Sequence, residues 1–254
     1  MAGCSASPQV PDSRKQNYPA LIQDSTERRE RADREWRRML DAYGAPYTSP
    51  ELYPVTYTPR SLAAVSGGLQ IMSAPPDPAM EELGLREGVK KFIDRWRELI
   101  GADPATISLV EASPIEGGQR LTYRQAGFSY PVADNFGVMI AVITSTGRLL
   151  QLDDRFLPVV ELPARPTIER EAAAAGLVGR TFTYSDIAGR PQQARINNEA
   201  EVTVRQLVVL PVEKENAIEA HLAWEIIAGS SLSWTVFIDA INGEELKVVQ
   251  NFQT

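Results

Sequence analysis

The chain has one cysteine and one histidine among its 254 residues. A single cysteine cannot form an intramolecular disulfide, and the two residues together cannot supply the ligand set of a structural zinc site. The sequence also contains no run of about 18 apolar residues, so it offers no candidate membrane-spanning helix. We therefore expect neither a disulfide framework nor a metal cofactor.

Nucleotide-binding glycine loops are also missing, because neither G-x-G-x-x-G nor G-x-x-x-x-G-K-[ST] occurs. The net charge of −7 argues against a nucleic-acid partner, which needs a concentrated basic surface. His221 lies inside a predicted strand without a paired nucleophile, so we interpret it as a structural or surface residue. The paired acids Asp153-Asp154 and Glu244-Glu245 lie at strand ends or turns and lack calcium-loop spacing. The sequence predicts no catalytic residue and no cofactor.

The first 25 residues are polar and contain proline, which predicts a flexible tether. Within this tether, Ala2-Gly3-Cys4 resembles the end of a bacterial lipobox, where small residues precede the cysteine that becomes lipidated. We therefore expect lipid on Cys4 and an extracytoplasmic, lipid-anchored place in a cell envelope. The alternative is a stray N-terminal cysteine.

Residues 26–44 predict a charged amphipathic helix. Ser25 or Thr26 can cap its start, and Gly44 can end it. Glu27 and Arg31 are four residues apart, a spacing that stabilises a helix by a few tenths of a kcal/mol. We expect the apolar residues at helical spacing to dock on the body of the protein or on a partner. They are Trp36, Met39, Leu40 and Tyr43.

Residues 45–84 are rich in proline, glycine and tyrosine, a composition that favours an extended connector. We interpret it as an arm on the protein's own surface; the alternative is a proline-rich ligand for another protein. Substitutions such as Trp36→Ala or Tyr53→Ala are expected to leave folding intact and weaken partner attachment. The candidate partner-binding residues of the helix and connector are Trp36, Met39, Leu40, Tyr43, Tyr47, Tyr53 and Tyr57.

Two α+β units are predicted after this extension, over residues 85–158 and 159–254. The first unit begins with an amphipathic helix that contains Trp96 and stops at Gly101. Ser145-Thr146-Gly147 is a hairpin turn, because glycine takes a positive φ without penalty. The predicted strands of this unit lie near 107–110, 121–125, 136–144 and 148–152. One helix packed on an antiparallel sheet is the simplest arrangement.

The second unit repeats this order, with Thr167 as a possible helix cap and Asn242-Gly243 as a two-residue hairpin turn. Its predicted strands lie near 180–185, 201–212, 218–228, 233–239 and 244–250. Alternate apolar residues of the later strands can share one face of a sheet. These are Leu222, Trp224, Ile226, Trp234, Val236 and Ile238, and the predicted structural core of the two units includes Trp96, Trp224, Trp234 and Ile238.

Several motifs occur in a fixed order over residues 86–250. They are Tyr123-Arg124-Gln125, Gly127, Pro131-Val132, "TSTGRLLQL", "RPTIEREA" and "LAWEI…SWTVFIDAINGEEL". This order resembles the propeptide of thermolysin-like metallopeptidases, in which a fungalysin/thermolysin-propeptide segment precedes a PepSY domain. The resemblance implies a PepSY/cystatin-like fold in both units. The chain departs from the family pattern over 127–134, where the segment is longer and lacks a second glycine.

The resemblance also implies a role in binding, because the equivalent unit of a zymogen packs on the protease, inhibits it and assists its folding. The chain has no H-E-x-x-H motif, so we expect a propeptide-like fold kept as a free-standing, non-catalytic protein. The N-terminal extension, which the family pattern does not require, favours a membrane-anchored accessory or structural subunit of a cell-envelope assembly. The alternative is a free-standing inhibitor or folding chaperone of a secreted metallopeptidase.

Overall fold

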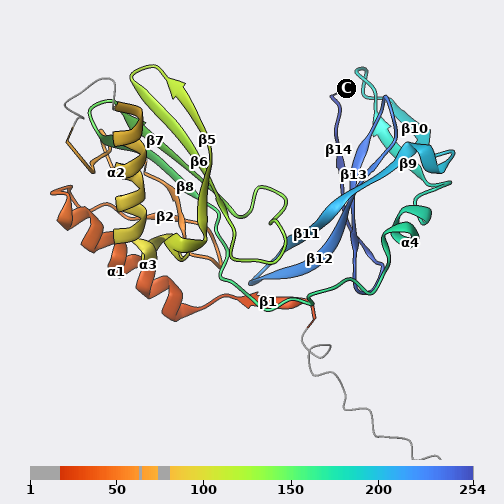
Figure 1. Ribbon diagram of the computed structural model, residues 1–254, viewed down its shortest axis with the longest axis horizontal. Coiled ribbons are helices and arrows are strands. Elements are labelled where there is room, and N and C mark those ends of the chain that lie inside the picture. Colours follow the sequence, from red (N-terminus) through yellow and green to blue (C-terminus); the bar gives the residue numbers. More distant parts are fainter. Residues whose placement is uncertain (1–17, 63–64, 74–80, 254) are drawn as a thin grey trace, which may run out of the picture.

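The computed structural model describes residues 18–62, 65–73 and 81–253, so Cys4 and most of the tether lie outside the described residues. The described chain is a mixed α+β protein with antiparallel sheets (Figure 1), which confirms the predicted fold class at this level. It has two lobes, each built around a separate five-stranded sheet. Within the described ranges, no helix has the length and apolar character needed to cross a membrane.

The sheet of the first lobe is an antiparallel meander with the strand order β4-β8-β7-β6-β5. Gly147 forms the β7–β8 hairpin turn as predicted, with a φ of 81° and its N–H bonded to the Thr144 carbonyl. A short pair formed by β2 and β3 lies beside this sheet. The strands are β2 (Glu51–Leu52), β3 (Pro59–Ser61), β4 (Leu69–Gln70), β5 (Ile107–Ile115), β6 (Gly118–Gln125), β7 (Val138–Thr144) and β8 (Arg148–Asp154).

The helices of the first lobe begin and end close to the predicted positions. They are α1 (Thr26–Ala42), α2 (Glu81–Arg95), α3 (Arg97–Ile100) and the 3-10 turn η3 (Pro104–Thr106). Ser25 caps α1 by accepting a hydrogen bond from the Arg28 N–H. The second predicted helix is interrupted at Trp96, and Gly101 ends it with a left-handed φ of 73°. In Figure 1, α2 lies along one side of the sheet, where it contacts β6 and β7.

The apolar stripe of α1 is part of the first core. Trp36 is 0% exposed and its indole N–H donates to the Thr48 carbonyl at 2.8 Å. Met39 and Leu40 are buried with it, together with residues of α2, α3 and the sheet. The connector also contributes buried residues to this core, among them Leu62, Val65 and Leu69. The prediction that Trp36, Met39 and Leu40 offer surface to a partner is therefore wrong, because the chain itself covers them.

The second sheet is organised around β12, which pairs with β11 on one side. On the other side it pairs with β1 through its first half and with β13 through its second half. A hairpin of β9 and β10 stands beside it, of which only the first strand was predicted. The elements are β1 (Ala20–Gln23), α4 (Arg170–Ala175), β9 (Thr181–Ser185), β10 (Pro191–Arg195), η4 (Glu199–Glu201), β11 (Val202–Lys214), β12 (Ala217–Ala228), β13 (Trp234–Asp239) and β14 (Glu245–Gln250).

The predicted cap of the short helix is wrong. The N-cap of α4 is Glu169, whose side chain makes no capping bond. The backbone N–H groups of Thr167 and Ile168 instead both donate to the Ala240 carbonyl, which holds this segment extended beside the turn after β13. That turn is longer than the predicted two-residue loop, since residues 240–244 separate β13 from β14, with Gly243 at a φ of 81°.

One face of the second sheet packs on α4 and the β9–β10 hairpin. Trp234 and Ile238 are buried there, and Trp224 is partly buried with its indole N–H bonded to the Ile168 carbonyl at 2.8 Å. In the first lobe, Trp96 is buried at the break between α2 and α3.

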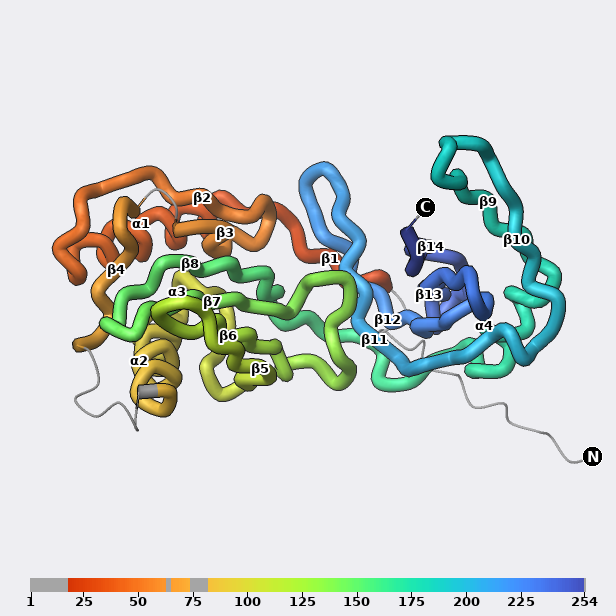
Figure 2. The backbone as a smooth tube through the Cα atoms, turned by 90° about the horizontal axis from the view of Figure 1, so that it is seen from above, coloured from red at the N-terminus to blue at the C-terminus, as the bar shows by residue number. Residues whose placement is uncertain are grey.

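The two lobes meet beside β1 and β11 (Figure 2), and a small cluster of buried residues forms the junction between them. The N-terminal segment crosses it, because β1 belongs to the second sheet and α1, which follows directly, belongs to the first lobe. The β6–β7 loop crosses in the other direction, with Ala133 donating to the Val209 carbonyl and Val209 donating to the Pro131 carbonyl, both at 2.9 Å. The buried junction residues are Ala20, Ile22, Val55, Val132, Phe136, Leu157, Val209, Ile218 and Ala220.

Candidate interaction surface

A buried polar cluster fixes the N-terminal segment to the second sheet. Asp239 is 0% exposed, and its Oδ2 accepts from the Tyr18 hydroxyl at 2.9 Å and lies 2.8 Å from His221 Nδ1. Its Oδ1 accepts from the backbone N–H groups of Ile241 and Asn242. His221 is itself buried, and this geometry gives it a place in the attachment of the N-terminal segment.

The cluster sets the pKa of the Asp239 carboxyl. Burial raises this pKa, but the hydrogen bonds from His221, the Ile241 N–H, Tyr18 and the Asn242 N–H outweigh burial, so the pKa lies below its ordinary value. The pKa of Tyr18 is raised by burial and by the negative charge of Asp239. The carboxylate is therefore the charged centre of the attachment, and the tyrosine stays neutral.

Asp239→Asn should lower the free energy of unfolding by about 1.5–3 kcal/mol at neutral pH, because an amide nitrogen cannot accept the bonds from Tyr18 and His221. A carboxyl whose pKa is lower in the folded state contributes stability above its unfolded pKa of about 3.9 and loses it as pH falls through the folded value. Urea denaturation at a series of pH values measures the difference, which should shrink towards zero in acid. The exposed Glu116→Gln is the control; a pH-independent difference for Asp239→Asn would contradict the prediction.

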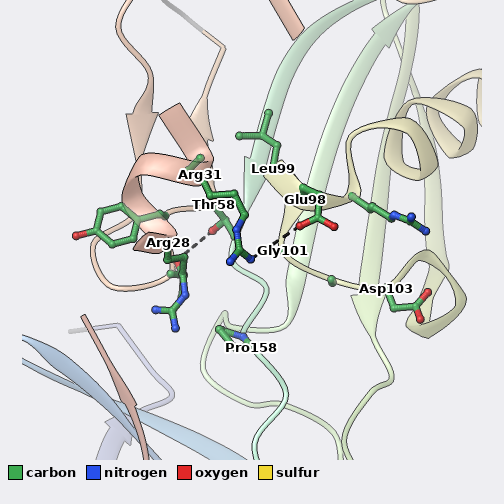
Figure 3. A pocket seen from close by; sticks show the side chains of 13 residues that line it. Arg28, Arg31, Thr58, Glu98, Leu99, Gly101, Asp103 and Pro158 are labelled. Carbon is green, nitrogen blue, oxygen red and sulfur yellow. Dashed lines mark hydrogen bonds and ion pairs between the residues drawn. The ribbon is translucent and has the colours of Figure 1, made fainter. Parts of the chain in front are cut away.

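A pocket of about 400 Å³ lies where α1, α3 and the β2–β3 turn meet (Figure 3). Arg28, Arg31 and Arg97 line it together with Glu98 and Asp103. Arg31 lies between Thr58 and Glu98 in Figure 3, 3.9 Å from the Glu98 carboxylate. Arg28 donates from Nη1 to the carbonyls of Gln23 and Val55. The pocket thus has mixed charge, and two of its arginines are used within the protein.

Most of the tyrosines predicted to bind a partner form hydrogen bonds within the chain. Tyr43 accepts from the Trp96 indole N–H at 3.2 Å, and Tyr57 donates to Asp24 at 2.6 Å. Tyr53 donates to Asp153 at 2.8 Å, and burial together with this bond raises the pKa of Tyr53 to about 12. Tyr47 differs, because it is 56% exposed with only the Arg37 guanidinium over its ring. Of the predicted partner-binding set, Tyr47 offers the largest exposed surface.

The side of the first sheet opposite α2 carries the surface that sequence reasoning missed. On β6 and β7, the residues that alternate with the buried ones point to this side. Cross-strand pairing places Arg124 opposite Val138, Thr122 opposite Ile140 and Arg120 opposite Val142. We call these residues the open face: Arg120, Thr122, Arg124, Val138, Ile140 and Val142. The arginines are exposed, and the three apolar residues are only partly buried.

A hollow of about 270 Å³ lies at the junction end of the open face. Val138 and Ile140 form its apolar side, and its polar rim consists of Asn135, Asp153 and Arg155 together with Tyr53. The Arg155 guanidinium stacks on the rings of Phe136 and Tyr53, at 4.3 and 4.8 Å from their centroids. At the opposite edge of the sheet, the bulge residue Val110 on β5 is 53% exposed.

The sequence held one signal of this surface. The β7 segment "VMIAVIT" is apolar at every position but the last, although a sheet covered on one side needs apolar residues only at alternate positions.

Among the described residues, no group of three or more His, Cys, Asp or Glu side chains is placed to hold a metal ion.

No protein-family model matches the chain, and no curated protein sequence matches it. Among solved structures, the chain is similar to the Bacillus megaterium YpeB C-terminal domain. The TM-score is 0.35 at 14% sequence identity, and the match covers 77% of this chain and 73% of that one. At this TM-score, no conclusion about the chain follows from the match.

Proposed function

We propose that this chain is a non-catalytic protein-binding module, built from two PepSY/cystatin-like units, that acts as a membrane-anchored accessory subunit in a cell envelope. The observation that carries the proposal is the open face, where Val138, Ile140 and Val142 lie in a row on β7 without a covering helix among the described elements. Partly exposed apolar residues grouped in this way are typical of surfaces that another protein covers.

The pattern of the first sheet supports this reading. An antiparallel sheet with one solvent-facing side normally carries polar residues there, as β6 does with Arg120, Thr122 and Arg124. The apolar row on β7 is not needed for the core, since Met139, Ala141 and Ile143 already fill the covered side. Interfaces typically combine such an apolar centre with a polar rim, and the arginines of β6 provide part of that rim.

The packing of helices on both sheets supports the two-unit arrangement. In the first lobe α2 contacts β6 and β7, and in the second lobe α4 contacts β11 and β12. The anchor would be Cys4, with two or three acyl chains giving stable attachment where a single chain is marginal. The N-terminal segment then leads from the membrane to β1, which is fixed to the second sheet through Tyr18 and Asp239.

Site-specific photocrosslinking in native membranes tests the proposal. A photoreactive residue at Val142 on the open face should give one discrete crosslinked protein, whereas the same residue at the exposed Gln193 of β10 should not. Intact-mass measurement of the membrane protein should show an acylated Cys4. If Val142 and Gln193 give the same products, the open face is not an interface. A secreted metallopeptidase as the crosslinked partner would favour the inhibitor or chaperone role over the accessory subunit.

A further inference from the structure

We infer that the open face binds an extended acidic segment of its partner, with one apolar side chain of that segment in the hollow beside β7. The inference rests on the proposed function and adds the chemistry of the partner. It combines three features of the face, namely the arginines of β6, the apolar row of β7 and the hollow at the junction end.

The arginines of β6 are a local positive charge on an acidic protein, whose net charge is −7. Arg120 and Arg124 are exposed, and neither pairs with a described acid, whereas arginines on the helices do, such as Arg37 with Asp33. A guanidinium without a partner is suited to a carboxylate, which it can bind through two parallel hydrogen bonds.

Acids on the two flanking strands have hydrogen-bond donors of their own. Glu111 on β5 lies opposite Thr122 and accepts from the Ser113 hydroxyl at 2.8 Å. Asp153 on β8 lies opposite Ile140 and accepts from Tyr53. The unpaired positive charge of the open face therefore lies on β6, whereas Arg155 at the rim of the hollow lies 3.4 Å from Glu213. This sets where the acidic side chains of a partner segment can lie.

The spacing of the arginines favours an extended segment. Arg120 and Arg124 are four positions apart on one strand, which corresponds to about 13 Å at about 3.3 Å per residue. A second extended chain parallel to β6 repeats its side chains at the same intervals, so carboxylates at its positions i and i+4 match both guanidinium groups. An apolar residue beside the carboxylate that meets Arg124 can reach the hollow, because Arg124 lies opposite Val138, which lines it together with Ile140.

Fluorescence anisotropy with the full chain tests this chemistry directly. The probe is a fluorescein-labelled peptide of about ten residues, with two glutamates four positions apart and leucines between them. Threonine fills the other positions because it favours an extended backbone. We expect saturable binding that weakens at least tenfold, about 1.4 kcal/mol, when Arg120→Glu and Arg124→Glu are combined. The combination of Arg165→Glu and Arg195→Glu, both exposed and on segments of the second lobe, changes the net charge equally and should leave affinity unchanged.

Three results would overturn the inference: no saturable binding, equal affinities of the two charge-reversed proteins with matching melting temperatures, or equal binding of a peptide with lysine in place of glutamate. Sedimentation as a dimer that the Arg120 and Arg124 changes dissociate would assign the face to a second copy of this chain instead. Crosslinking from Val142 distinguishes a failure of the inferred partner chemistry from a failure of the proposed function. A captured partner without acidic-peptide binding overturns the chemistry alone, whereas peptide binding without a captured partner overturns the proposed function alone.

Discussion

Trp36→Ala is expected to lower the free energy of unfolding by about 3–5 kcal/mol, a large share of the roughly 5–15 kcal/mol that stabilises a domain. The side chain is fully buried between α1 and the rest of the first core, so its loss leaves a cavity. The loss also leaves the Thr48 carbonyl without the indole donor. Urea denaturation followed by far-UV circular dichroism measures the change.

Tyr47→Ala is the matched control on the same extension, because Tyr47 is exposed and the Arg37 guanidinium lies over its ring at 5.1 Å from the centroid. Surface substitutions of this kind change stability by about 0.5 kcal/mol or less. If Trp36→Ala were as mild as Tyr47→Ala, α1 would not be part of the folded body, and Trp36 would again be a candidate for partner binding.

The helix of Trp36 shows where sequence reasoning reached its limit. Its bounds and its cap at Ser25 follow from local chemistry, namely the apolar period and a side chain that accepts the Arg28 N–H. The surface that its apolar stripe meets depends on residues far along the chain. The buried Leu62 and Leu69 stand in a segment rich in Pro, Gly and Tyr, which obscures their part in the core.

The positions of two hairpin turns were predictable for the same local reason, although the turn at Gly243 is longer than the predicted two-residue loop. Gly147 and Gly243 have a positive φ at the turns where the sequence placed them. The attachment of the N-terminal segment was not predictable, because Tyr18 and Asp239 are 221 positions apart and no periodicity links them. The open face was missed because an apolar run alone does not show which of its two faces a helix will cover.

The open face lies next to contacts that join the two lobes. The hollow beside β7 includes Arg155, which also lies 3.4 Å from Glu213 of β11. The β6–β7 loop, which follows the arginine-bearing strand β6, is hydrogen-bonded to Val209 of β11. A ligand at the open face would therefore contact elements that hold the second lobe in place.

Trp234→Ala should destabilise the second lobe by about 3–5 kcal/mol. Its ring is 3% exposed and stacks on Phe182, with centroids 4.6 Å apart and an interplanar angle of 9°. Phe252 meets the same ring edge-on at 5.2 Å, so one substitution removes contacts to the β9–β10 hairpin and to the C-terminal end of the described chain.

Trp224 is the comparison within the same core, because it is only partly buried and makes one indole hydrogen bond, to the Ile168 carbonyl. Trp224→Ala should therefore cost about 1–3 kcal/mol, less than Trp234→Ala. Hydrogen exchange locates the effect: in Trp234→Ala, amides of β9–β14 should lose protection while β6 and β7 of the first lobe keep theirs. Equal losses in both lobes would mean that the junction makes them one cooperative unit, and unchanged protection in β9–β14 would show that the Phe182–Trp234–Phe252 stack does not stabilise the second sheet.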